Sequence, residues 1–334
     1  MVKADGFTCA EAAKMLDIPV GTVKYQVHEA LLRLRAQLGD EGARPGKKAS
    51  VDIPAPTALT KEVVTMTEND PETFSSFEEA ESLLGVPVLG FIPMISEEPL
   101  RLLGDMSHFS PLMESYRSLR THLRFCKEVP LKTLVITSSV PAEGKSTAAA
   151  NLAMALAKDK KRVILIDADL RRPRQHKLLQ VEARPGLTDL LLGTHSLDQV
   201  LRPSGVEGVS LITSGTPSTI PTELIGSPEM EQLLEKLKAQ SDIVVIDTAP
   251  VLAVADTCAL AHATDGVLLV IWAGETKRAH VQRTADLLKR CRAQVVGTVL
   301  NCMPMPGYYG KYYVLSEEEE LVTSGSSKES QINE

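Results

Sequence analysis

The sequence predicts an α/β domain in which helices cover both faces of a parallel sheet. Apolar segments of strand length recur through its second part, and stretches of helical period separate several of them. Chemically distinctive residues directly follow these segments, at the strand ends where parallel sheets bind ligands. The predicted strands are Thr133–Ser138, Val163–Asp167, Val209–Thr213, Ile243–Asp247, Val267–Trp272 and Val295–Leu300.

Composition narrows the class of protein. The chain has 334 residues, of which 43% are hydrophobic, and its net charge is −7. This composition excludes a disordered or collagen-like chain. The longest uninterrupted apolar run, Val267–Ala273, is far shorter than the ~20 residues of a membrane-spanning helix. The chain opens without a secretory leader, and its five scattered cysteines form no C-x-x-C pair. We therefore expect a cytoplasmic protein.

The first element expected is a helical segment over residues 1–38. Thr8 and Thr22 can cap two short helices that are joined by a turn containing Gly21, as in a helix-turn-helix. The Gly21–Lys24 stretch resembles the recognition-helix start in the DNA-binding region of extracytoplasmic-function sigma factors. The segment is therefore a candidate for DNA binding. The alternative is a helical hairpin that has no affinity for DNA. Residues 39–75 are rich in glycine and proline and predict a flexible linker.

The second element is a phosphate-binding loop over residues 139–146, SVPAEGKS, between a strand and a helix. Backbone N–H groups at such a helix start bind phosphate oxygens, Lys145 would reach the β- and γ-phosphates, and Ser146 would bind Mg²⁺. This predicts a P-loop NTPase-like fold that takes ATP and Mg²⁺, whereas an ordinary turn would not need Lys145. The candidate nucleotide-binding residues here are Ser139, Pro141, Glu143, Gly144, Lys145, Ser146 and Thr147.

Acidic residues end two further strands. Asp167 and Asp169 leave one strand at i, i+2, so their side chains share a side, and Asp247 ends another. Close carboxylates repel one another unless a cation neutralises them, which predicts a Mg²⁺ site made by Ser146, Asp169 and Asp247. The alternative is a charged turn in which the following arginines neutralise the acids.

Together these three stretches resemble the Walker A, Walker A′ and Walker B elements of the bacterial tyrosine kinases (BY-kinases) of polysaccharide assembly. The resemblance covers residues 77–313 and places a kinase domain at 76–307. It includes the Glu78–Pro93 lead-in, Pro221–Leu224, Val254–Asp256 and the strand that ends in Asn301. It implies protein-tyrosine substrates and a membrane activator protein of polysaccharide assembly, with the chain at the inner face of the plasma membrane.

The resemblance also implies residue roles. Asp167 would act as the base that accepts the tyrosine proton, and Arg171 would help to position the phosphate or the acceptor. Asn301 would join the nucleotide-binding residues.

A predicted helix over residues 110–125 carries Glu114, Arg117 and Arg120 at i, i+3, i+6. The spacing alone predicts a solvated face with an internal Glu114–Arg117 pair. The E-x-x-R-x-x-R pattern is similar to the subunit-contact helix of the BY-kinases, and this similarity implies a homo-oligomer, in the form of a ring.

The last element is the tail, residues 308–334. Four of the chain's six tyrosines lie within six residues here: Tyr308, Tyr309, Tyr312 and Tyr313. They alternate with glycine and lysine as in a loop, and Glu317–Glu320 follow. The resemblance implies a phosphoacceptor cluster, whereas tyrosines packed on a sheet edge or a partner are the alternative.

Two other functions fit parts of the pattern. One is a deviant-Walker ATPase switch of the partition or cell-division type, although Val140 stands where those families carry an extra lysine. The other is a DNA-binding regulator whose α/β domain senses a nucleotide.

Overall fold

The computed structural model describes residues 3–4, 7–8, 72–74, 76–94, 102–105 and 110–304. The chain divides into two units, residues 1–69 with 95–99 and residues 70–94 with 100–334. In the first unit, β1 (Lys3–Ala4) pairs antiparallel with β2 (Phe7–Thr8), which contains the threonine expected to cap a helix. The rest of the predicted helix-turn-helix, and the linker up to residue 71, lie outside the described residues.

The second unit is built on a sheet whose described strands follow the order β3-β10-β9-β4-β8-β5-β7-β6. All neighbours are parallel except β6 and β7. The strands are β3 (Val88–Pro93), β4 (Thr133–Ser138), β5 (Val163–Asp167), β6 (Leu201–Pro203), β7 (Val209–Ile212), β8 (Ile243–Asp247), β9 (Gly266–Trp272) and β10 (Val295–Met303).

The predicted α/β fold is confirmed, with small differences at strand ends. The strands β4, β5 and β8 have the predicted bounds, and each is buried at every residue. The strand β10 continues past Leu300 to Met303 because it pairs with β3 on one side and β9 on the other. The edge strand β6 was not predicted. It has only three residues and none of them is buried, so its sequence shows no recognisable strand pattern.

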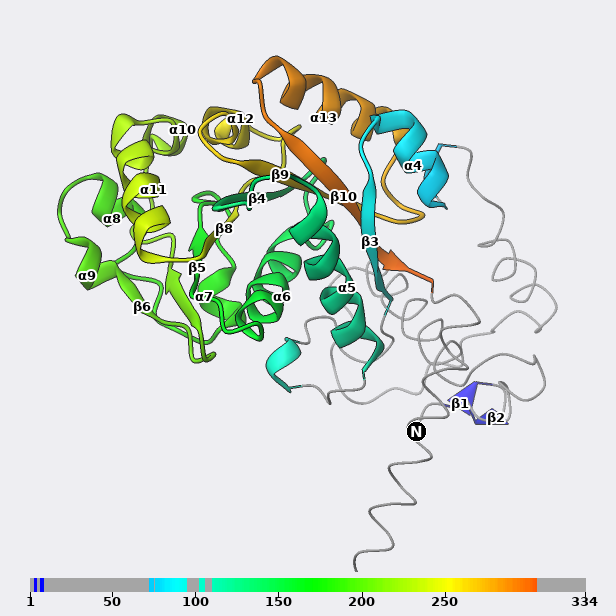
Figure 1. Ribbon diagram of the computed structural model, residues 1–334, viewed down its shortest axis with the longest axis horizontal. Helices are drawn as coiled ribbons and strands as arrows, with labels where there is room; N and C mark the ends of the chain where they lie inside the picture. The colour runs from blue at the N-terminus through cyan, green and yellow to red at the C-terminus, as the bar shows by residue number, and fades with distance from the viewer. Residues whose placement is uncertain are drawn as a thin grey trace, which may run out of the picture. The chain divides into compact units, whose positions relative to one another are not determined.

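Helices cover both faces of the sheet (Figure 1). The helices α5 (Pro111–Phe125) and α6 (Lys145–Ala157) lie on one face, and α12 (Asp256–Ala261) and α13 (Arg278–Arg290) lie on the other. The remaining described helices are α4 (Phe77–Leu84), the 3₁₀ helix Leu103–Asp105, α7 (Gln175–Leu178), α8 (Leu187–Leu191), α9 (Leu197–Val200), α10 (Pro221–Ile225) and α11 (Pro228–Gln240). Within the described ranges, none of them combines the length and apolarity that crossing a membrane requires.

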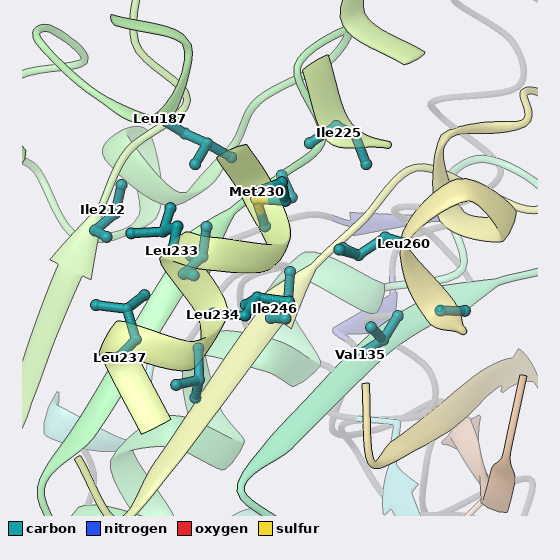
Figure 2. Close-up of a cluster of buried hydrophobic side chains, with 14 of the residues drawn as sticks. Val135, Leu187, Ile212, Ile225, Met230, Leu233, Leu234, Leu237, Ile246 and Leu260 are labelled. Atoms are coloured by element: carbon teal, nitrogen blue, oxygen red, sulfur yellow. The ribbon is translucent and has the colours of Figure 1, made fainter. Parts of the chain in front are cut away.

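The helix α11 anchors the middle of the sheet. Its residues Met230, Leu233, Leu234 and Leu237 are buried at the spacing of one helix face. They belong to one apolar cluster with Ile246 of β8, as Figure 2 shows. This packing holds β8 firmly just before its last residue, an aspartate.

Candidate nucleotide and metal site

The order of the strands brings the three predicted motifs together. The strand β8 lies between β4 and β5, and Asp247 is the register partner of both Ile136 and Asp167. The phosphate-binding loop follows β4, so it emerges at the same edge as the two aspartates. Residues far apart in sequence therefore form one site because parallel strands end together.

Lys145 is the centre of this site. Its ammonium group lies 2.7 Å from Asp169 Oδ2, 3.4 Å from Asp247 Oδ1 and 3.2 Å from Ser146 Oγ. Burial acts to lower the pKa of Lys145, but the negative charges of Asp247 and Asp169 outweigh it and raise the pKa. The lysine is therefore charged and offsets part of the negative charge of the two carboxylates that it contacts.

The oxygen atoms around Lys145 suit Mg²⁺. Two carboxylates and one hydroxyl already converge on a single positive charge, and all three side chains are buried. Oxygen donors of this kind are what Mg²⁺ prefers, usually together with water and substrate phosphates. The predicted set of Ser146, Asp169 and Asp247 thus lies within 3.4 Å of one ammonium nitrogen.

Asp167 differs from the other two aspartates because it does not contact the lysine. Its Oδ2 accepts hydrogen bonds from the backbone N–H groups of Arg174 and Gln175, at 3.0 and 2.9 Å. Its buried Oδ1 has no hydrogen-bond partner among the described residues. Burial and the neighbouring charge of Asp247 raise the pKa of Asp167 to about 8. One oxygen therefore remains to accept a proton, and its pKa is suited to proton transfer near neutral pH.

Gln175 links the three motifs, and no pattern in the sequence predicts this role. Its side-chain Nε2 donates to Ser146 O and to Asp247 Oδ2, both at 2.9 Å, while its backbone N–H donates to Asp167. The side chain is fully buried. A glutamine eight residues after a strand end belongs to no recognisable pattern, so only the fold reveals its role.

Glu143 fastens the phosphate-binding loop. Its buried carboxylate accepts a hydrogen bond from Val140 N–H at 2.9 Å and another from the Thr276 hydroxyl. Burial raises the pKa of Glu143, and these hydrogen bonds act against that rise. The side chain of Glu143, a residue of the predicted nucleotide-binding loop, is thus engaged with the protein itself. We name the contact between Glu143 and Thr276 the loop latch.

Asn301 closes the loop from the other side. Its Nδ2 donates to the carbonyl oxygen of Glu143 at 2.9 Å. It packs so closely on Gly144 that a Cβ atom added there would lie 2.1 Å from Asn301 Nδ2. Gly144 also has a φ of 85°, a left-handed conformation that favours glycine. This position therefore requires glycine on two grounds.

The loop latch carries a testable prediction. We expect Glu143→Ala to raise the KM for ATP about tenfold with a smaller change in kcat, because the loop would lose a charge-assisted hydrogen bond that fixes its shape. Steady-state kinetics with varied ATP would measure this. Thr276→Val should show the same effect in weaker form and Thr276→Ser should restore the wild-type KM; equal KM values for all variants would contradict the latch.

Arg171 has partners other than those expected from sequence. It forms a two-pronged contact with Asp256, through Nε at 2.9 Å and Nη2 at 3.2 Å, and Nη2 also donates to Thr222 at 3.0 Å. Asp256 is fully buried. The arginine thus joins the end of β5 to α10 and α12, and Lys145 rather than Arg171 neutralises Asp169. The interpretation in which the following arginines neutralise the acids is wrong for Arg171.

The other predicted residues are placed as follows. Ser139 is buried and its hydroxyl has no partner among the described residues, Pro141 is exposed and Thr147 is half-buried. On α5, Arg117 pairs with Glu114 at 3.2 Å, as the spacing alone predicts. Arg120 is bound within the chain, to Ala155 O at 2.9 Å and Asp159 at 3.1 Å. The tyrosine cluster at 308–313 lies outside the described residues.

Several known proteins similar to this chain are named tyrosine kinases. A family model described as an AAA domain matches residues 132–294. Tyrosine-protein kinase YwqD of Bacillus subtilis is 38% identical over 59% of this chain and 86% of its own length. The putative tyrosine-protein kinase EpsB of Ralstonia nicotianae is 39% identical over 61% of this chain but only 28% of its own length. The kinase domain of Escherichia coli tyrosine kinase ETK superimposes with a TM-score of 0.65 at 29% identity, covering 70% of this chain and 96% of that domain.

Proposed function

The chain belongs to the bacterial tyrosine kinases, and from that premise we propose that it transfers the γ-phosphoryl group of ATP to the tyrosine cluster of another copy of itself. The observation that carries the proposal is the convergence of Lys145, Asp169, Asp247 and Ser146 next to Asp167, one carboxylate oxygen of which has no partner in the part of the chain that the structure describes.

Phosphoryl transfer depends mainly on positioning and on neutralising negative charge. The backbone N–H groups of the loop and the Lys145 ammonium would bind the phosphates. A Mg²⁺ ion held by Ser146, Asp169 and Asp247 would offset the charge that develops on the phosphoryl oxygens.

The acceptor tyrosine must lose a proton, and its unperturbed pKa is about 10. Asp167 Oδ1 would accept that proton, while the N–H groups of Arg174 and Gln175 hold Oδ2 in place. Arg171 would act as a positioning residue, because its guanidinium is tied to Asp256 at the edge of the site.

The proposed acceptors are Tyr308, Tyr309, Tyr312 and Tyr313 of a neighbouring copy in a ring. The side chains of Glu114 and Arg117 on α5 are 43% and 39% exposed and could meet a neighbour, whereas that of Arg120 is only 19% exposed. We therefore assign the main subunit contact on this helix to Glu114 and Arg117.

The resemblance to kinases of polysaccharide assembly supports a regulatory role in exopolysaccharide or capsule synthesis. In that role a membrane activator protein would bring the chain to the inner face of the plasma membrane. Protein-tyrosine substrates beyond the tail belong to the same proposal.

Mass spectrometry of the full chain after incubation with Mg-ATP tests the function. Phosphate on the tyrosines of residues 308–313 is the expected result. Release of ADP without any phosphotyrosine would contradict the kinase and favour a switch ATPase. The Arg117→Ala variant, compared with Arg124→Ala on the same helix, would show by light scattering whether α5 holds the copies together.

A further inference from the structure

A group of positive side chains borders the candidate site. Arg172, Arg174 and Lys177 follow the Asp167–Asp169 pair within ten residues, and all three are exposed. We call these three residues the basic rim. None of them forms an ion pair with another residue in the described part of the chain. Their charges are therefore available to a binding partner.

The rim is fixed in position relative to the catalytic carboxylates. The backbone N–H of Arg172 donates to Asp169 Oδ1 at 2.9 Å, and that of Arg174 donates to Asp167 Oδ2 at 3.0 Å. The short helix α7 then carries Lys177, and its first residue, Gln175, is bound to Asp247. The backbone under the rim is thus attached to the aspartates of the site at several points.

The rim differs from the neighbouring Arg171, whose charge is already used. Arg171 is held by the buried carboxylate of Asp256, so it is occupied within the domain. What remains is three exposed cations on the segment whose backbone binds Asp167 and Asp169, where the proposed reaction would need a tyrosine. Such a cluster favours an acceptor with negative charges close to the tyrosine.

The chain itself contains a segment of this kind. Glu317–Glu320 are four consecutive acids, and Glu317 lies four residues after Tyr313. Four extended residues span at most about 14 Å, so the acids and the tyrosines could reach the rim and the site at the same time.

We propose that the basic rim binds Glu317–Glu320 of a second copy and so directs the tyrosines before them to Asp167. This inference rests on the proposed kinase function and specifies its acceptor as a tyrosine followed by acidic residues. Exposed ion pairs are individually weak and are screened by salt, so the rim acts through several charges together. It should change the KM for the acceptor and leave the KM for ATP unchanged.

The test uses the full chain as enzyme and synthetic peptides of residues 305–322 as acceptors. One peptide has the natural sequence and the other has glutamine at positions 317–320. We expect the glutamine peptide to show a KM about tenfold higher at low salt, a difference that shrinks as salt is raised.

Matched enzyme variants identify the rim as the cause. A triple variant of the rim should raise the KM for the natural peptide and leave the KM for the glutamine peptide unchanged. It combines Arg172→Gln, Arg174→Gln and Lys177→Gln. A control variant should change neither KM value. It combines Arg283→Gln, Lys289→Gln and Arg290→Gln, at exposed positions of α13. Exchanging the charges, with glutamate on the rim and lysine at peptide positions 317–320, should restore the low KM.

The outcomes separate this inference from the proposed function. If wild-type enzyme phosphorylates both peptides with equal KM, the rim inference is wrong and the kinase stands. A raised KM for ATP in the rim variant would also overturn it, because the rim would then serve the nucleotide. If no tyrosine is phosphorylated in either peptide or in the chain itself, both proposals fail.

Discussion

Replacing Lys145 with methionine is expected to reduce tyrosine phosphorylation at least about 100-fold, because the site loses the charge that would stabilise the transferring phosphoryl group. The lysine also forms ion pairs with Asp169 and Asp247, both within 3.4 Å. Removing one partner of a buried ion pair leaves charge unpaired, so we also expect the free energy of unfolding to fall by roughly 3 kcal/mol. Phosphotyrosine immunodetection and thermal melting measure the two effects.

Two controls separate chemistry from folding. Lys158→Met removes an exposed lysine at the other end of the same helix and should change neither readout. Lys145→Arg keeps a charge near the aspartates and should recover part of the stability, but not the phosphorylation. Wild-type phosphorylation in Lys145→Met would refute the assignment of the site.

Asp167→Asn is expected to lower kcat for tyrosine phosphorylation about 100-fold with little change in ATP affinity, since a general base contributes about 10²–10⁴-fold to rate. An asparagine can still accept the hydrogen bonds from Arg174 and Gln175 with its remaining oxygen. The variant thus removes the base and preserves the local backbone. Kinetics with varied peptide and nucleotide would make the measurement, and an unchanged kcat would exclude Asp167 as the base.

The same variant should alter how stability depends on pH. Burial raises the pKa of Asp167 from 3.8 to about 8, so the folded chain binds this proton more tightly than the unfolded chain. The wild type therefore loses stability from this group as pH rises from about 4 to about 8. Asparagine does not titrate. The melting temperature of Asp167→Asn should therefore exceed that of the wild type by an amount that grows as the pH rises over that range. A constant difference in melting temperature would contradict the raised pKa.

Sequence predicts the central strands well because they are unambiguous in physical terms. The segments that became β4, β5 and β8 contain three or four consecutive apolar residues, a pattern typical of strands buried on both faces of a sheet, and every residue of these strands is buried. The short edge strand β6 offers no such run, so its pairing depends on contacts that only the folded chain provides.

Some residues of the candidate site can likewise be predicted from the sequence, and others cannot. Asp167 and Asp247 end strands, Asp169 lies two residues beyond β5, and Lys145 begins the helix that follows the loop after β4, so the strand order brings them together. Gln175, Thr276 and Asp256 lie in loops or at helix starts, and their partners are set by how those segments fold back. The partner of Arg171 could not be predicted for the same reason: Asp256 is 85 positions away along the chain.

The position of Lys145 has a consequence for the empty enzyme. Its ammonium occupies the point on which oxygens of Ser146, Asp169 and Asp247 converge, so part of the negative charge at this edge of the sheet is offset before any cofactor arrives. Folding therefore need not wait for a divalent ion, and chelating agents should inhibit catalysis without melting the domain. If a bound nucleotide and Mg²⁺ left the proposed site, the Lys145 ammonium would again contact these oxygens and preserve the ion pairs of the domain.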